Sequence, residues 1–347
     1  MTELEVLVLD KQAVLAAGGD DMGLAISAVE HVLGCHARGE TVLPSKTVLR
    51  WGGPETELHQ GRINAMPGYV GGRYNMAGIK WIGSHPPNVE KGLPRASGII
   101  ILNDPETKFP VAILEASVIS AMRTGAVTGV AAKYLAREDA TRLGMIGAGV
   151  QARTQIRAVC HVRPSIREVR VFDLNAERCQ AFAAEMEGVL GIPVRPAASA
   201  QEAVDGADIL ITATTTTKPI VKEEWMRPGM FYAQVGGYEA EIDVLLHSDK
   251  VVLDDWTEVM HRGIATPYQA AAAGRFSRAQ LHAELGEIIN GTKPGRESAH
   301  ERIFFNAVGM GTEDVALATD VWRNAQARGL GQRIKLWPSG PLTGLAG

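Results

Sequence analysis

A glycine-rich turn lies near the middle of the 347-residue chain, between a short apolar segment and a segment with few helix breakers. Gly147 and Gly149 are followed by Ala152, in the spacing G-x-G-x-x-A. The first glycine suits a tight turn, the second lets a phosphate approach the backbone, and the small third residue lets helix and strand pack closely. A second predicted strand, 168–172, ends at Asp173. This context predicts a βαβ unit that binds a dinucleotide at the N-terminus of its helix.

Asp173 also indicates which dinucleotide is bound. A carboxylate at this position accepts hydrogen bonds from a ribose 2′-hydroxyl and repels a 2′-phosphate, which favours NAD over NADP. Arg178 follows shortly after Asp173 and could complicate this preference.

The composition excludes several classes of protein. The formal net charge is −4 without a long basic run, which argues against nucleic-acid binding. The apolar runs are too short to span a bilayer, and the first residues lack the basic and apolar regions of a secretory signal. The cysteines have neither metal-ligand nor disulfide spacing; they are Cys35, Cys160 and Cys179. We therefore expect a cytoplasmic protein without a metal site or a membrane partner.

Strands and helices alternate after the glycine turn, which is typical of a doubly wound parallel sheet. We predict an α/β Rossmann-type domain over residues 125–315. Residues 1–124, rich in short β-type runs broken by Gly and Pro, would join residues 316–347 in a second, α+β domain for substrate binding and dimerisation. Ligands would bind at the carboxyl ends of the parallel strands, where the two domains face each other.

Further cofactor contacts follow from position in such a fold. The residues that open the helix after the glycine turn would face the pyrophosphate, and those that end later strands would face the ribose, the phosphates or the nicotinamide. For the threonines, a loop of high β-propensity is the alternative explanation. The residues in question are Val150, Gln151, Thr212, Thr214, Thr215, Val235, Gly236, Ala307 and Gly309.

Four segments together resemble the ornithine cyclodeaminase/μ-crystallin family. They are residues 78–88 (GIKWIGSHPPN), 120–126 (SAMRTGA), 147–153 (GAGVQAR) and 306–314 (NAVGMGTED), in the family's order across most of the chain. The resemblance implies a nicotinamide-dependent enzyme of amino or imino acids, and a homodimer joined through the non-nucleotide domain.

Within these segments, Lys80 and Arg123 match the family's substrate-binding and catalytic positions, and Arg123 would also lie near the cofactor. A buried ammonium at Lys80 needs an anionic partner, which a substrate carboxylate would supply, or an imine nitrogen sharing its proton. The planar guanidinium of Arg123 suits bidentate binding of a carboxylate. The alternatives without a functional role are that Lys80 reaches solvent from a strand edge and that Arg123 lies on a helix surface.

Other cations depart from the family pattern. Lys46 stands where many relatives have an arginine, and Arg50 could replace it because residues four apart share a face of a strand; the sequence does not choose between them. Arg95 stands where the cyclodeaminases have a threonine. An additional cation there suits a substrate with more than one carboxylate, unless it pairs with a local acid such as Glu90.

After the Gly236-Gly237 turn, Tyr238 occupies the position of the cyclodeaminases' catalytic aspartate. A tyrosine side chain, with an ordinary pKa of about 10, is a poor base, although it can still contact substrate. Glu239 and Glu241 are nearby but would need a rearranged loop. Of two histidines considered, His85 is the better polar-site candidate and His282 the more structural. Ornithine cyclisation is therefore disfavoured.

With these departures, the chain resembles the branch of the family that oxidises N-(2-amino-2-carboxyethyl)-L-glutamate with NAD. The products of that branch are 2,3-diaminopropionate and 2-oxoglutarate, in siderophore and related pathways. Hydride removal at a Cα–N bond would give an imine that water hydrolyses. The alternatives are an ornithine or lysine cyclodeaminase, a ketimine or pyrroline-2-carboxylate reductase or alanine-type dehydrogenase, and a non-enzymatic binding protein like μ-crystallin.

Overall fold

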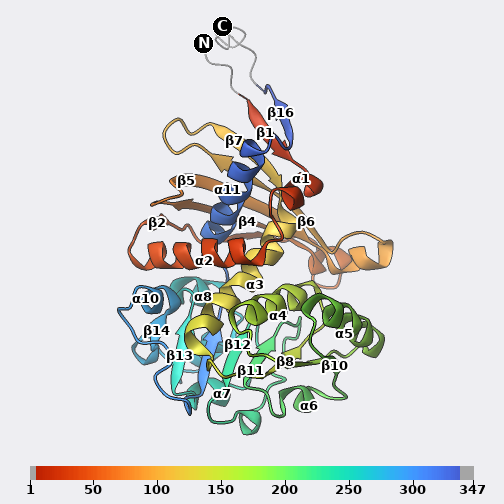
Figure 1. Ribbon diagram of the computed structural model, residues 1–347, viewed down its shortest axis with the longest axis vertical. Helices are drawn as coiled ribbons and strands as arrows, with labels where there is room; N and C mark the ends of the chain where they lie inside the picture. Colours follow the sequence, from red (N-terminus) through yellow and green to blue (C-terminus); the bar gives the residue numbers. More distant parts are fainter. Residues whose placement is uncertain (1–4, 337–347) are drawn as a thin grey trace. The chain divides into compact units, whose positions relative to one another are not determined.

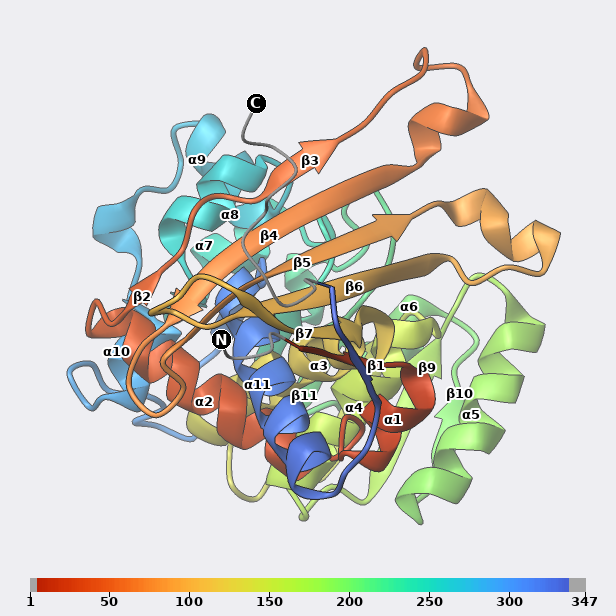
Figure 2. The same ribbon diagram turned by 90° about the horizontal axis from the view of Figure 1, so that it is seen from above.

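The computed structural model describes residues 5–336, which group by their internal contacts into two units. Unit 1 contains the residues up to Leu24, Glu40–Ser120 and the residues from Met310. Unit 2 contains Ala25–Gly39 and Ala121–Gly309. Figures 1 and 2 show that each unit is built on its own β-sheet.

Unit 2 is a parallel sheet with strand order β10-β9-β8-β11-β12-β15-β13-β14, which confirms the predicted doubly wound fold. Side chains of the central strands are buried, as in sheets covered on both faces. The strand order reverses direction between β8 and β11, so the carboxyl ends of these two strands form the switch point where such sheets bind ligands. The strands are β8 (Arg142–Ile146), β9 (Glu168–Phe172), β10 (Val194–Pro196), β11 (Ile209–Thr212), β12 (Phe231–Gln234), β13 (Lys250–Leu253), β14 (Ala283–Glu284) and β15 (Ile303–Asn306).

The α-helices of unit 2 lie between these strands in the sequence. They are α4 (Val150–Val162), α5 (Ala176–Leu190), α6 (Ala200–Val204), α7 (Ile242–Leu246), α8 (Trp256–Arg262), α9 (Thr266–Ala272) and α10 (Leu285–Ile289). Two longer helices contribute residues to both units: α2 (Met22–Ala37) and α3 (Ala116–Leu135).

Most of α2 belongs to unit 2, whereas the sequence placed it with the N-terminal domain. Its polar partners explain the difference. His36 Nε2 lies 2.9 Å from Asp255 Oδ2, just before α8. Glu30 accepts hydrogen bonds from Lys133 Nζ and from the Tyr134 hydroxyl near the end of α3, at 2.8 and 2.5 Å. Through these contacts α2 binds to elements of unit 2. The spacing of apolar residues along α2 cannot predict such contacts.

Unit 1 is a mostly antiparallel sheet of order β16-β1-β7-β6-β5-β4-β2, in which β3 also pairs with β4. Helix α11 packs on β4, β5 and β6, as Figures 1 and 2 both show. Gly68 permits this approach, because a Cβ there would lie 2.9 Å from the Thr312 methyl group. The elements are β1 (Val6–Leu9), α1 (Lys11–Ala16), β2 (Thr41–Val42), β3 (Thr47–Leu49), β4 (Arg62–Val70), β5 (Met76–Ser84), β6 (Ala96–Asn103), β7 (Pro110–Glu115), α11 (Gly311–Ala327) and β16 (Gln332–Ile334).

Candidate functional site

The glycine turn connects β8 to α4 at the switch point of the unit 2 sheet. Gly147 has a φ of +106°, which L side chains rarely adopt, and its amide donates to the Phe172 carbonyl at 2.7 Å. A Cβ at this position would also lie 2.6 Å from the Ala213 carbonyl oxygen. Gly149, the N-cap of α4, instead faces open space, because a Cβ there would meet no atom within 4 Å. The turn therefore leaves room for a phosphate group at the amino end of α4.

Asp173 follows β9 and is held against this turn. One carboxylate oxygen accepts from the Ala148 amide at 2.8 Å, and the other accepts from the Asn175 amide at 2.9 Å and from Arg178 Nη2 at 2.5 Å. Burial would raise the pKa of Asp173, but Arg178 and the two amides outweigh burial and hold this pKa below its ordinary value. Arg178 thus pairs with the acid, and the carboxylate keeps its charge beside the turn.

Glu239 joins the loops that follow β11 and β12. Its Oε2 accepts from the Thr212 hydroxyl and the Gly236 amide, each at 2.7 Å. Its Oε1 accepts from the Thr214 amide at 2.6 Å and the Thr214 hydroxyl at 2.7 Å. The side chain is fully buried, and burial raises the pKa of Glu239 even though all four donors favour the carboxylate. Because both oxygens are occupied, Glu239 anchors the loops rather than serving as a free base.

A buried tyrosine extends this network. The hydroxyls of Tyr232 and Thr212 lie 2.9 Å apart, and the Thr212 hydrogen is directed to Glu239. Tyr232 is therefore the donor to Thr212. The predicted cofactor residues Thr212, Thr214 and Gly236 are thus held in one hydrogen-bonded cluster, a connection that the sequence did not reveal.

A second buried acid holds the segment after β15. Asp254 follows β13, and its Oδ2 accepts from the Gly309 amide at 2.7 Å. Burial raises the pKa of Asp254 to about 6, although the amides of Gly309, Val308 and Asp255 oppose this shift. Gly309 has a φ of +74°, and a Cβ there would overlap the guanidinium of Arg123. The structure therefore brings predicted cofactor residues Arg123 and Gly309 together within unit 2.

Lys80 lies in unit 1 with only 1% of its surface exposed. Its Nζ is 2.7 Å from Asp314 Oδ2 in the first turn of α11 and donates to the Ser120 hydroxyl at 3.1 Å. The buried ammonium thus has an anionic partner within the protein, whereas the sequence assigned that partner to the substrate. Asp314 belongs to the family segment 306–314, but nothing in the sequence of that segment indicates that it is the counter-ion of Lys80.

The strand register of unit 1 locates Lys46 and Arg50. Val48 pairs with Asn64, and Met66 on the same strand pairs with Lys80. Paired residues and alternate residues share a face of a sheet. Continued by one residue at each end of β3, this register places both Lys46 and Arg50 on the face that carries Lys80. Each therefore stays a candidate substrate contact.

Arg95, His85 and Tyr238 are placed as follows. Arg95 immediately precedes β6, and among residues 5–336 it forms no ion pair with Glu90 or with another carboxylate. His85 donates its amide to the Arg95 carbonyl at 2.8 Å, and its ring lies 3.3 Å from Glu57. Tyr238 lies half-buried in the turn after β12. Its contact with substrate stays a prediction.

The remaining predicted residues lie near these groups or have structural partners. Val150 and Gln151 begin α4, with Val150 66% exposed beside the turn. Thr215 and Val235 follow the ends of β11 and β12, and Ala307 follows β15. The ring of His282 bonds the Pro294 carbonyl at 2.9 Å, which agrees with its structural interpretation.

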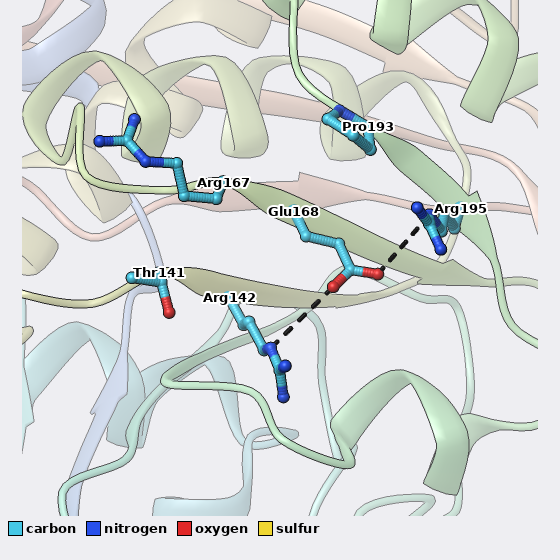
Figure 3. Close-up of a pocket in the computed structure, with 6 residues that line it drawn as sticks. All are labelled: Thr141, Arg142, Arg167, Glu168, Pro193 and Arg195. Atoms are coloured by element: carbon cyan, nitrogen blue, oxygen red, sulfur yellow. Dashed lines mark ion pairs between the residues drawn. The ribbon is translucent and has the colours of Figure 1, made fainter.

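A surface pocket on unit 2 lies at the opposite edge of the sheet. It is lined by Thr141, Arg142, Arg167, Glu168, Pro193 and Arg195, at or beside the amino ends of β8, β9 and β10 (Figure 3). The Glu168 carboxylate lies between two arginines, 4.0 Å from Arg142 and 3.8 Å from Arg195. Exposed pairs of this length contribute little to stability. Doubly wound sheets bind ligands at the carboxyl edge, so this pocket carries no assignment.

The described residues lack what a metal site, a disulfide or a membrane-spanning helix requires. Within residues 5–336 no group of three His, Cys, Asp or Glu residues is arranged to hold a metal ion. Within the same residues, Cys35, Cys160 and Cys179 form no disulfide, and burial raises the pKa of Cys160 to about 12. Every helix in this part of the chain is too short or too polar to span a bilayer.

Comparison with known proteins agrees with this geometry. The family model for the ornithine cyclodeaminase/mu-crystallin family matches residues 20–329. An N-((2S)-2-amino-2-carboxyethyl)-L-glutamate dehydrogenase of Staphylococcus aureus is 37% identical over 96% of this chain and 99% of its own. The Thermococcus litoralis Δ1-pyrroline-2-carboxylate reductase, solved with NADH and L-proline, is 36% identical, with a TM-score of 0.88 over 95% of this chain and all of its own. An archaeal alanine dehydrogenase dimer with bound NAD is 34% identical, with a TM-score of 0.87 over 96% of this chain and all of its own. The chain belongs to the ornithine cyclodeaminase/mu-crystallin family.

Proposed function

We propose that the chain is an NAD-dependent dehydrogenase that oxidises the Cα–N bond of an amino acid with several carboxylates. The substrate that fits best is N-(2-amino-2-carboxyethyl)-L-glutamate, which with NAD⁺ and water would yield 2,3-diaminopropionate, 2-oxoglutarate, NADH and a proton. The observation that carries the substrate class is the placement of Arg95 and Arg50 in unit 1 without a carboxylate partner in the described chain. The Staphylococcus aureus relative, which is named for this substrate, supports the same conclusion.

The residues at the carboxyl edge of the unit 2 sheet fit NAD. Gly149 leaves open space at the start of α4, and Asp173 keeps a charged carboxylate beside the turn, where it would accept from ribose hydroxyls and repel a 2′-phosphate. Glu239 holds Thr212, Thr214 and Gly236 beside them. When bound, NAD supplies the hydride acceptor for the reaction.

Lys80 and Arg123 are the proposed catalytic residues. Lys80 has an anionic partner in Asp314, 2.7 Å away, and its ammonium would bind a substrate carboxylate or share a proton with the reacting nitrogen. Arg123 is buried to 7% exposure against Gly309 and offers a planar fork for a carboxylate. Lys46 or Arg50, Arg95 and Tyr238 are the proposed additional substrate contacts.

The cyclodeaminase alternative lacks a free base in the turn after β12. Tyr238 replaces the aspartate, and Glu239 has both oxygens occupied by loop donors. Glu241 accepts from the Glu223 amide at 3.1 Å and is likewise committed to the backbone. A pyrroline-2-carboxylate reductase or an alanine dehydrogenase would need only one carboxylate site, which leaves Arg95 and Arg50 without a role.

The proposal is tested by incubating the purified protein with a substrate panel and NAD or NADP, while following NADH or NADPH absorbance and identifying the products. We expect NADH formation from N-(2-amino-2-carboxyethyl)-L-glutamate, with NAD preferred over NADP. Net turnover of ornithine without NADH would establish the cyclodeaminase instead. Preferred turnover of alanine, or of Δ1-pyrroline-2-carboxylate with reduced cofactor, would establish one of the other enzymes. Cofactor binding without any turnover would favour a binding protein.

We further propose that the chain works as a homodimer joined through the unit 1 sheet, in a reducing cytoplasm that suits cysteines outside disulfides. The sheet face opposite Lys80 carries exposed apolar side chains: Leu49 at 42%, Trp81 at 39% and Ile99 at 41%. Trp81 and Ile99 are direct cross-strand partners, so they form one apolar strip. Contiguous exposed apolar surface of this kind marks an interaction site.

Replacing both Trp81 and Ile99 with glutamate is expected to give a folded monomer, because two charges would be desolvated at the centre of the contact. Light scattering during size-exclusion chromatography measures the mass, and circular dichroism checks the fold. Glutamate at Leu174, which is 94% exposed in unit 2, is the matched control and should stay dimeric. A wild-type monomer, or a dimeric double variant, would refute this interface.

A further inference from the structure

We propose that Arg62 forms, with Arg50 and Arg95, a subsite for a second, distal carboxylate of the substrate, and that Asn64 provides a neutral hydrogen bond there. This inference rests on the proposed function, because it names the residues that would select a polycarboxylate. Neither Arg62 nor Asn64 belongs to the segments that revealed the family.

The strand register places Arg62 on the same sheet face as Lys80. Arg62, the first residue of β4, pairs with Ser84 at the end of β5, and Met66 pairs with Lys80. Because alternate residues share a face, the side chains of Arg62, Asn64 and Met66 lie on the side of Lys80. Helix α11 begins over the other part of this strand, since a Cβ at Gly68 would contact Thr312.

Arg50 and Arg95 come from neighbouring strand ends. Leu49 pairs with Ile63, so the next pair along this antiparallel ladder is Arg50 with Arg62. Ser84, the partner of Arg62, also pairs with Ala96 on β6, and Arg95 immediately precedes Ala96. Arg50 thus shares the face of Arg62, and Arg95 lies at the same end of the sheet, near enough for its charge to act on the Arg62 guanidinium.

No acid in the described chain neutralises these three arginines by an ion pair. The nearby Glu57 is already bound, with Lys91 Nζ at 2.6 Å and His85 Nε2 at 3.3 Å. Burial, reinforced by the charges of Arg50 and Arg95, lowers the pKa of Arg62. Arg62 is half-buried, whereas Arg50 and Arg95 are exposed. Like charges gathered around a half-buried guanidinium are unfavourable unless an anion joins them, so the cluster suits an anionic ligand.

Asn64 supplies an independent observation at the same place. Its side-chain Oδ1 is buried and has no hydrogen-bond partner within the described residues. Buried polar atoms are nearly always hydrogen-bonded in folded proteins, so an unpartnered one indicates a missing ligand or water. Rotation of the amide by half a turn would direct its NH₂ group to the same position. A carboxylate held by arginines could then accept from Asn64.

The spacing along the sheet suits a substrate with separated carboxylates. Ser84 lies four residues beyond Lys80 on β5, which corresponds to about 13 Å along an extended strand. A substrate with one carboxylate near its reacting carbon and another several bonds away can therefore reach both, whereas alanine or a pyrroline carboxylate cannot.

The test compares paired ligands that differ only in the distal carboxylate. With Arg62→Gln, we expect KM for N-(2-amino-2-carboxyethyl)-L-glutamate to rise about 10- to 100-fold, the effect of losing a hydrogen-bonded charge. KM for the corresponding glutamine analogue, which already lacks that charge, should change less than about threefold, within the usual context dependence of such values. Arg333→Gln, an exposed arginine on β16 that pairs with Glu5, is the control and should leave both values unchanged.

A binding measurement separates this inference from the proposed function. Isothermal titration of 2-oxoglutarate and 2-oxopentanoate into the NADH-saturated protein is expected to show tighter binding of the dicarboxylate, and Arg62→Gln should abolish this preference. Loss of the preference would support the subsite even if the wild type oxidises none of the amino acids. Equal binding of both acids by the wild type, or a preference that persists in the variant, would overturn it.

Discussion

Replacing Lys80 with methionine is expected to lower kcat/KM by about 10²- to 10⁴-fold, the usual range for losing a group that positions charge and shares a proton. The ammonium is almost fully buried and lies beside Asp314, so its removal takes a charged partner away from a buried carboxylate. Breaking a buried pair in this way costs about 3–5 kcal/mol of stability. Steady-state kinetics and urea unfolding measure the two effects.

A second variant separates catalysis from folding. In the double variant Lys80→Met with Asp314→Leu, both buried charges are gone, and apolar replacement of a buried pair is often neutral for stability. We expect the free energy of unfolding to recover while kcat/KM stays low. If activity recovers together with stability, Lys80 has only a structural role and its catalytic assignment fails.

Replacing Glu239 with glutamine is expected to weaken NAD binding by about tenfold to a hundredfold. Four loop donors converge on this carboxylate, and the amide NH₂ of glutamine cannot accept from the two donors that face it. Each donor left buried without a partner costs about 1–3 kcal/mol, which displaces the Thr214 and Gly236 loops. Fluorescence titration with NADH measures the affinity directly.

Glu241→Gln is the matched control for this experiment, because it lies two residues away and accepts from one backbone amide only. We expect its NADH affinity to stay within about threefold of the wild type, inside normal context effects. Equal losses in the two variants would indicate general damage to the turn, and full affinity in Glu239→Gln would show that the loops do not need this anchor.

Much of the unit 2 sheet could be predicted because its strands are continuous apolar runs that alternate with helices, as at residues 142–146 and 209–212. Strand β4 is harder to predict from its residues. Pro67 and Gly68 interrupt its pattern, yet it pairs along nine residues with β5. The assignment of most of α2 to unit 2 also depends on partners far away in the sequence, such as Asp255 for His36.

The residues of the candidate site also fall into two groups, those that the sequence predicts and those that it does not. The glycine turn and Asp173 follow from local spacing, and the structure holds the acid against the turn through the Ala148 amide. By contrast, Asp314, Arg62 and the anchoring role of Glu239 depend on which strands and helices become neighbours. The residues around a single arginine or glutamate outside a motif do not show which side chains will be its neighbours in the fold. That Arg50, Arg62 and Arg95 lie at one end of the sheet follows only from the pairing of the strands.

The acids that hold loops at the carboxyl edge of the unit 2 sheet have a consequence for how ligand affinity arises. Asp173, Glu239 and Asp254 each hold a loop through backbone amides, so the chain itself supplies the anion that orders those loops. The entropic cost of ordering these loops therefore belongs to folding and not to dinucleotide binding. Such a site is preorganised: it binds with little rearrangement, and its affinity also depends on Glu239 and Asp254, which act through the loops that they hold.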